Sequence, residues 1–101
     1  MIDAAEAAQS FVAGRRRVDL DVDRMLLFAL VRAVGILGEA ASRMTPAARA
    51  AAPDVPWLDI VALRDRLPAA DFDTDRDLLW QTVVDEIPPV LARLRSIASK
   101  P

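Results

Sequence analysis

The chain has 101 residues, which is enough for one small domain with a limited hydrophobic core. Its 13 basic and 15 acidic residues give a net charge of −2, so there is no overall attraction to nucleic acid, and any RNA contact would need a local basic patch. Because cysteine and histidine are both absent, the chain has no residue for a disulfide and lacks the usual thiolate and imidazole ligands of zinc.

The composition favours helices. Apolar residues make up 53% of the chain, aromatic residues only 5%, and there are three glycines. Such a mix is typical of closely packed helices rather than sheets. The longest apolar run, Met25–Val31, is far shorter than the roughly 20 residues of a membrane span, and the acidic, alanine-rich start does not resemble a signal peptide. We therefore expect a soluble, cytoplasmic protein that makes no membrane contact.

The first predicted helix covers Ile2–Val12 and is followed by Gly14, a residue suited to a helix C-terminus. Arg15, Arg16 and Arg17 come next and form the one basic run of the sequence. This run suits either a contact with an RNA backbone or a partner, or a solvated loop. The solvated loop is the preferred interpretation.

The second predicted helix runs from about Asp21 to Met44, with acidic residues in its first turn, where the helix dipole favours them. Its polar side chains fall on one stripe, and most of the remaining surface is apolar. The stripe consists of Arg24, Arg32, Glu39, Ser42 and Arg43. A helix this apolar is buried on more than one side, so we expect it to contribute to a dimer interface.

Thr45-Pro46 has the pattern of an N-cap followed by proline at the first helical position, and it opens a short turn in an alanine-rich connector. The next helix is predicted over Pro56–Leu67, with Trp57 as its anchor. Proline cannot donate a backbone hydrogen bond, so this helix should kink or stop at Pro68.

The C-terminal stretch opens with a predicted turn at Phe72–Asp75 and then shows one amphipathic helical face. The apolar residues of that face are Leu79, Trp80, Val83, Val84, Ile87, Val90, Leu91, Leu94 and Ile97. We expect a kink or break at Pro88-Pro89. Trp57 and Trp80 suit core or interface anchors better than base-stacking groups. The predicted fold class is all-α, a small up-and-down helical bundle.

Three blocks of the sequence occur in the order found in one known family. Residues 24–42 read RMLLFALVRAVGILGEAAS, residues 55–73 read VPWLDIVALRDRLPAADFD, and residues 72–91 read FDTDRDLLWQTVVDEIPPVL. They resemble the second helix, the Pro-Trp motif segment and the closing Phe-Asp segment of the HepT-like branch of the HEPN superfamily. Three ordered matches disfavour the alternative, an unrelated helical bundle rich in alanine and leucine. The resemblance implies a single HepT-like HEPN domain over residues 1–101.

The resemblance also implies an activity and partners. Members of this branch are homodimers that cut RNA at the dimer interface without a metal or other cofactor. They commonly act as toxins and pair with a small MNT-type nucleotidyltransferase antitoxin. From this likeness we expect a homodimer through the long second helix and the C-terminal helix, together with a nucleotidyltransferase partner.

The family's catalytic motif is incomplete here, because Arg64 is present but Ala69 occupies the position of the histidine. Cutting RNA without a metal uses the ribose 2′-hydroxyl as nucleophile, which calls for an acid or base of near-neutral pKa, and histidine suits that role. An arginine supplies a bidentate cation for the phosphorane charge. Arg64 is therefore the expected catalytic residue, and Arg64, Arg66 and Arg32 are the expected RNA contacts. We expect ribonuclease activity to be absent or strongly reduced.

Two further residues of the expected site differ from the family pattern. Asp71 occupies the position of the motif tyrosine, which the partner enzyme of this family can modify with AMP; a carboxylate offers no phenolic oxygen, and the chain has no tyrosine. Gly35 stands where the family has a glutamate on the polar stripe. These changes leave two alternatives open. Either the chain is an RNA-cleaving toxin scaffold with an impaired site, or it is a non-catalytic dimerisation and partner-binding module in which Arg64 simply pairs with Asp59 or Asp65.

Overall fold

The computed structural model describes residues 1–66 and 76–98, with the side chains of residues 1–63 and 76–97. Within these ranges every regular element is a helix. The elements are α1 (Ile2–Val12), α2 (Asp19–Val22), α3 (Arg24–Ser42), α4 (Pro46–Ala50), α5 (Trp57–Arg66), α6 (Arg76–Gln81), the π-helix η1 (Thr82–Glu86) and α7 (Ile87–Ala98). The predicted all-α class is confirmed.

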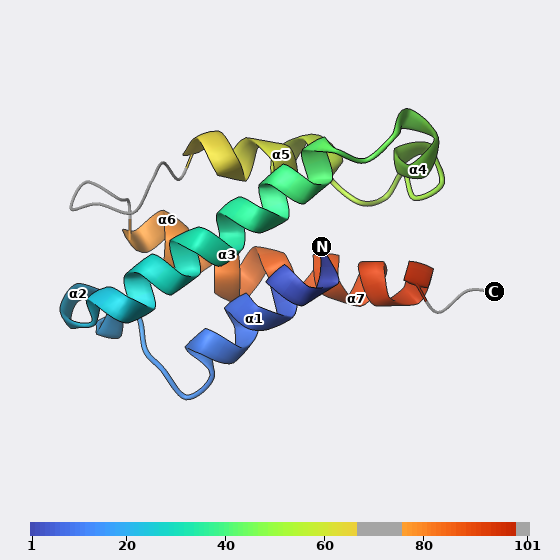
Figure 1. Cartoon of the computed structure of the whole chain (residues 1–101). Coiled ribbons are helices and arrows are strands. Elements are labelled where there is room, and N and C mark those ends of the chain that lie inside the picture. The colour runs from blue at the N-terminus through green and yellow to red at the C-terminus, as the bar shows by residue number, and fades with distance from the viewer. Residues whose placement is uncertain (67–75, 99–101) are drawn as a thin grey trace.

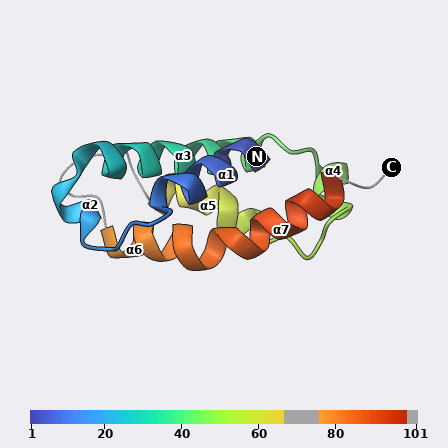
Figure 2. The ribbon, with the colours of Figure 1, turned by 90° about the horizontal axis from the view of Figure 1, so that it is seen from below.

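Four rods make up the bundle, and consecutive rods run in opposite directions (Figure 1). They are α1, α3, α5 and the continuous rod of α6, η1 and α7. Helix α3 packs against both α1 and α5, and α1 packs against η1 and α7. In the turned view of Figure 2, α3 and the C-terminal rod lie on opposite sides of the bundle, with α1 and α5 between them. This is the predicted up-and-down arrangement.

The first helix has the predicted bounds. Gly14 lies just beyond the end of α1 and has a positive φ of 72°, a conformation that glycine adopts without the steric cost of a Cβ. The reason for a glycine at this point in the sequence is therefore the tight turn into the Arg15–Arg17 segment.

The second predicted helix is wrong in one respect, because it is divided at Asp23. This residue is extended (φ −115°, ψ 97°), and its carboxylate accepts a hydrogen bond from the backbone N–H of Leu26, so it caps α3. The short helix α2 precedes the cap. The three aspartates at positions 19, 21 and 23 hid this boundary, since acidic residues at the start of a helix also suit its first turn.

The connector and the next helix follow the prediction where the structure describes them. The Thr45 hydroxyl accepts a hydrogen bond from the N–H of Ala48, and Pro46 opens α4. Helix α5 begins at Trp57, whose indole N–H donates to the Ala52 carbonyl at 3.0 Å. The predicted stop at Pro68 and the predicted turn at 72–75 lie outside the described residues.

The kink or break expected at Pro88-Pro89 takes the form of a π-helix directly before the prolines, and the helix does not break there. Both prolines lie in the first turn of α7, and the irregular turn comes before them, as η1. In a regular α-helix their nitrogens would donate to the carbonyls of Val84 and Asp85, and proline has no N–H to do so. The backbone instead widens, and the N–H of Ile87 donates to the Thr82 carbonyl five residues back. The rod stays continuous through this wider turn.

The core is built around the inner face of α3, where Leu30, Val34 and Leu37 are almost completely buried. Leu79, Ile87 and Leu91 of the C-terminal rod close it from the other side. Helix α3 has the length and mean hydropathy (1.7) of a membrane span, but half of that window is buried inside the bundle. A buried core helix that packs against neighbours on two flanks can have the same length and mean hydropathy as a membrane span.

Candidate functional site

The motif arginine lies in the last turn of α5. This helix is fixed to α3 through its buried residues Trp57, Ile60 and Leu63. Arg64 and Arg66 follow directly, so the backbone that carries them is anchored to the core. Their side chains lie outside what the structure describes, as do Ala69 and Asp71. The alternative pairing of Arg64 with Asp59 or Asp65 is likewise outside the described side chains.

Arg32, the third expected RNA contact, is exposed near the middle of α3. It lines a shallow groove of about 380 Å³ whose walls come from α1 and α3. We call this the α1–α3 groove; its lining is Asp3, Ala4, Ala7, Phe11, Ala29, Arg32, Ala33 and Ile36. No residue of α5 lines this groove, and the position of the Arg64 side chain relative to Arg32 lies outside the described residues.

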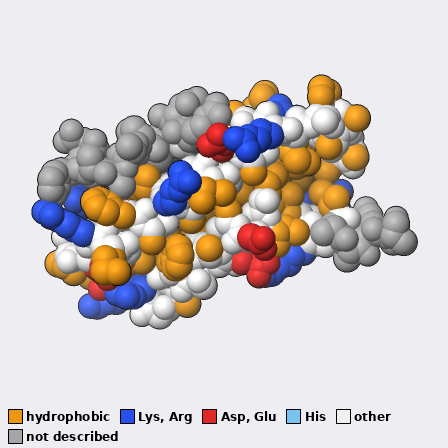
Figure 3. Space-filling model, in the orientation of Figure 1, with side chains coloured by type: hydrophobic (Ala, Val, Ile, Leu, Met, Phe, Trp, Pro, Cys, Tyr) orange, Lys and Arg blue, Asp and Glu red, His pale blue; other side chains and the backbone are white. Residues whose placement is uncertain are grey.

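The surface around this groove is unusually apolar for an exposed face. Phe11, Phe28 and Ile36 are about 40 to 50% exposed, and Met25 is 83% exposed. Figure 3 views the molecule from the side of Figure 1 and shows hydrophobic side chains over α1 and α3, with basic and acidic side chains between them. The predicted polar stripe of α3 is therefore interspersed with large apolar residues. That arrangement is typical of an interaction surface.

Gly35 stands one turn along α3 from Arg32. A Cβ atom built there would meet nothing within 4 Å outside the helix's own backbone, and the backbone has no positive φ. Neither packing nor backbone geometry requires glycine at this position. A larger side chain, such as the glutamate that the resemblance places here, would therefore find free space at this position.

The basic run is more structured than predicted. Arg17 donates from Nε to Asp77 at 2.7 Å and from Nη1 to Asp21 at 3.1 Å, and Arg15 pairs with Asp23 at 3.3 Å. The hydrogen bonds to Asp77 and then Asp21 raise the pKa of Arg17 further above its usual range. Arg17 thus ties the α1–α2 connection to the start of α6, which follows directly after the motif segment.

Sequence reasoning missed this contact because Arg17 and Asp77 are 60 residues apart. The i, i+4 spacing of Arg17 and Asp21 was the available signal. Among the described residues, no group of three or more carboxylates is placed to hold a metal ion.

The comparison with known families decides the identity of the fold. The family described as Ribonuclease HepT-like matches residues 1–97, which include both the α3 block and the motif segment. The chain belongs to the HepT-like ribonuclease family. The resemblance inferred from the three sequence blocks is therefore confirmed.

Three relatives show how this HepT-like chain compares with named proteins. A protein of Thermococcus cleftensis named "Probable ribonuclease HepT" is 31% identical over 98 residues, which cover 94% of this chain and 89% of the relative. A "Putative RNase" of Methanocaldococcus jannaschii is 30% identical over 93 residues, covering 89% and 85%. A "Putative RNase" of Caldanaerobacter subterraneus is 32% identical over 82 residues, covering 81% and 73%. No solved structure matches the chain.

Proposed function

We propose that this chain is the toxin-side component of a HEPN/MNT toxin–antitoxin pair, a metal-independent RNA-cleaving scaffold whose own active site is impaired. The observation that carries the proposal is the family match over residues 1–97 combined with the sequence of the motif segment. That segment keeps Arg64 but has alanine at position 69 and aspartate at position 71.

The chemistry follows from what remains of the motif. The guanidinium of Arg64 can bind a phosphodiester with two hydrogen bonds and stabilise negative charge as the 2′-oxygen attacks phosphorus. The attack also requires that a proton leave the 2′-hydroxyl and that one reach the departing 5′-oxygen. Alanine has no titratable group for either transfer. Asp71 is a poor substitute, because an ordinary aspartate is ionised at neutral pH and repels the phosphate.

RNA binding, in this proposal, depends on Arg64 and Arg66 at the end of α5, with Arg32 on α3. The chain has a net charge of −2, so these few arginines must supply the attraction locally. The bound RNA would then be held without being cut.

The proposed homodimer uses the α1–α3 groove and the apolar side chains around it. Phe28 and Ile36 of α3 and Phe11 of α1 supply large apolar area, while Ala29 and Ala33 allow close approach of a second helix. The described part of α7 exposes mainly Pro89, Ala92, Arg95 and Ser96, so it offers less apolar surface than the sequence-based expectation assigned to it.

The proposed partner is an MNT-type nucleotidyltransferase, and the proposed location is the cytoplasm, where RNA is available. Because Asp71 replaces the tyrosine that accepts AMP in the family, the partner could bind this chain but could not modify it at that position. Regulation by that modification is therefore lost together with the activity.

A double revertant tests the proposal. Purified wild-type chain and the Ala69→His, Asp71→Tyr variant would be incubated with tRNA and mRNA in the presence of EDTA. We expect the revertant to cleave about 10²–10⁴-fold faster than the wild type, which is the range for one general acid–base group. Arg64→Ala in the revertant background is the control and should remove the gain. An inert, folded revertant would reject the toxin scaffold, and Arg64-dependent cleavage by the wild type would reject the impaired site.

A non-catalytic dimerisation and partner-binding module is the second candidate. The exposed apolar face favours it, because that surface serves binding whether or not RNA is cut. This candidate predicts that Arg64→Ala changes neither RNA binding nor capture of a co-expressed nucleotidyltransferase. A tenfold loss of RNA affinity in the same variant would instead favour the RNA-binding scaffold.

A further inference from the structure

A second hollow lies on the side of the bundle opposite the α1–α3 groove, where α5 does not pack tightly against the C-terminal rod. Helix α5 packs extensively on α3, but in the described part of the chain it makes no comparable contact with η1 or α7. A narrow cavity of about 70 Å³ remains between them and opens into a shallower hollow of about 400 Å³. Pro56, Glu86 and Val90 line both, so the two form one continuous groove.

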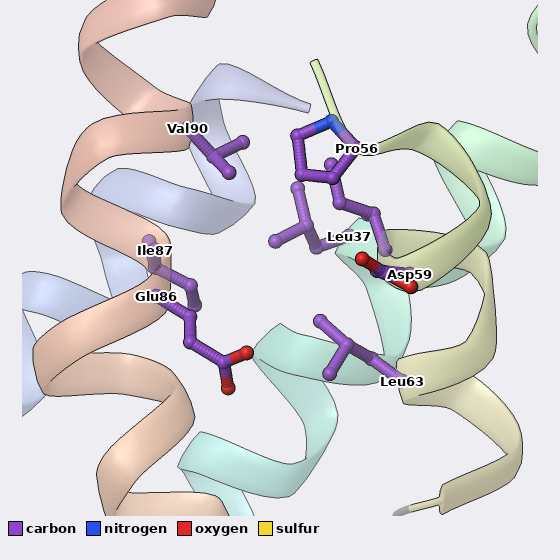
Figure 4. Close-up of a pocket in the computed structure, with 8 residues that line it drawn as sticks. Leu37, Pro56, Asp59, Leu63, Glu86, Ile87 and Val90 are labelled. Carbon is purple, nitrogen blue, oxygen red and sulfur yellow. The ribbon is translucent and has the colours of Figure 1, made fainter. Parts of the chain in front are cut away.

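The walls of the narrow part are apolar and its edge is acidic. Leu37, Leu63, Ile87 and Val90 contribute aliphatic side chains from α3, α5 and α7. Figure 4 shows the carboxylates of Asp59 and Glu86 on opposite walls, both directed toward the gap between the helices. We call this surface the acidic groove; it is defined by Leu37, Asp59, Leu63, Glu86, Ile87 and Val90.

The negative charge at the edge of the acidic groove is not neutralised by described neighbours. Asp59 and Asp85 are exposed, and neither forms an ion pair with a described residue. Glu86 accepts a hydrogen bond from the Thr82 hydroxyl at 3.1 Å, which positions its carboxylate without supplying positive charge. The basic residue that lines the wider hollow, Arg93, already pairs with Asp54 at 2.6 Å.

The π-helix contributes to this arrangement. Glu86 is its last residue and Ile87 begins α7, so the wide turn that accommodates the two prolines also brings one charged and one apolar side chain to the groove. Turns of this type recur at functional sites in helical proteins. The geometry that lines the groove thus comes from a local feature of the sequence, the Pro88-Pro89 pair.

The shape and the charge of the acidic groove together indicate which kind of molecule can bind there. An RNA phosphate would be repelled by the carboxylates, and a purely apolar helix would leave them without counterions. The narrow cavity is several times larger than the roughly 10–15 Å³ that one water needs, so it can admit an alkyl chain. Lysine and arginine have the required form, an aliphatic stem with a terminal cation.

We propose that the acidic groove binds a basic amphipathic segment of a partner protein. One lysine or arginine of that segment places its stem between Leu63 and Ile87 and its cation between Asp59 and Glu86. Further basic residues of the segment face Asp85 above the wider hollow. This surface is separate from the α1–α3 face and does not depend on RNA cleavage, so the chain can dimerise and bind a partner at the same time.

The experiment uses a fluorescein-labelled amphipathic peptide of leucine and lysine, and a second peptide with glutamine in place of each lysine. Binding to the full chain would be measured by fluorescence anisotropy at 150 mM salt, and the site mapped from backbone amide shifts in NMR spectra. We expect saturable binding of the lysine peptide only, with shifts concentrated in α5, η1 and the start of α7. The double variant Asp59→Asn, Glu86→Gln should bind at least about tenfold more weakly, as expected for loss of close charge pairs.

The matched control is Asp3→Asn, Glu39→Gln, which changes the net charge by the same amount on the α1 and α3 side of the molecule. It should keep wild-type affinity within about twofold, as expected for charges remote from the contact. Equal losses in both double variants would mean attraction to an acidic protein without a specific site and would overturn the proposal. Amide shifts confined to α1 and α3, or no saturable binding of the lysine peptide, would overturn it as well.

Discussion

The two sides of this bundle differ in both shape and charge. On one side α1 and α3 pack closely and present a shallow apolar groove, with Arg32 and Asp3 at its edges. On the other side α5 and the C-terminal rod stand apart and leave a narrower cleft edged by carboxylates. The surplus of apolar residues in this short chain is therefore unevenly distributed over its surface. One side suits association with a second copy, and the other suits a cationic partner.

The largest expected change in the free energy of unfolding comes from a substitution in the buried face of α3. Leu30→Ala removes a completely buried side chain from the inner face of α3, and we expect a loss of about 2–5 kcal/mol in the free energy of unfolding. Val90→Ala, in the half-buried wall of the acidic groove, should cost about 1 kcal/mol. Urea denaturation at matched protein concentration measures both. Equal losses would show that the α5–α7 side is packed as tightly as the core.

The next effect concerns self-association through the apolar face. Phe28→Asp places a charge on that face, and we expect the dimer dissociation constant to rise at least about tenfold, because an aromatic anchor is replaced by a charge that must be desolvated. Sedimentation equilibrium measures the constant.

The matched control is Leu58→Asp, at an exposed leucine of α5 outside the α1–α3 groove. It should leave the constant unchanged. A wild-type chain that stays monomeric at high concentration, or equal weakening in both variants, would remove the apolar face as the dimer interface.

The smallest effect tests whether Gly35 is a matter of chemistry or of packing. Because a Cβ there has free space, Gly35→Ala should raise the free energy of unfolding by about 1 kcal/mol through the higher helix propensity of alanine. Gly14→Ala should have the opposite sign, since its φ of 72° is strained for any residue with a Cβ. Thermal unfolding followed by circular dichroism would compare them. Destabilisation by Gly35→Ala would show that a neighbour occupies that space.

Most of the fold could be predicted from the sequence because its signals are local. The bounds of the first helix follow from apolar spacing and Gly14, and the start of α4 follows from Thr45-Pro46. The division at Asp23 could not be predicted, because an aspartate near a helix start fits both the first turn and the cap. The position of the irregular turn before Pro88 could not be predicted either. A pair of prolines can end a helix or be accommodated by a wider turn before it, and the outcome depends on packing against neighbouring helices.

For the candidate site, the sequence predicted which residues to consider but not how they are arranged in space. The motif pattern pointed to Arg64 and to replacements at positions 69 and 71, and these assignments stay predictions, because the family match shows only that residues 1–97 belong to the family. That Arg32 lies in a groove with α1 depends on which flank of α3 each neighbouring helix takes, information that one sequence does not contain. The long-range contact between Arg17 and Asp77 and the gap beside α5 depend on tertiary packing for the same reason.

The two tryptophans give the chain an intrinsic fluorescence signal. There is no tyrosine, and the two tryptophans are the only indoles, so the near-ultraviolet emission comes from Trp57 and Trp80 alone. Trp57 is buried, donates to the Ala52 carbonyl and is bonded directly to Pro56, which lines the acidic groove. The contribution of Trp57 to the fluorescence spectrum therefore responds to the integrity of the α4–α5 connection and to a molecule that binds beside Pro56, without an added dye.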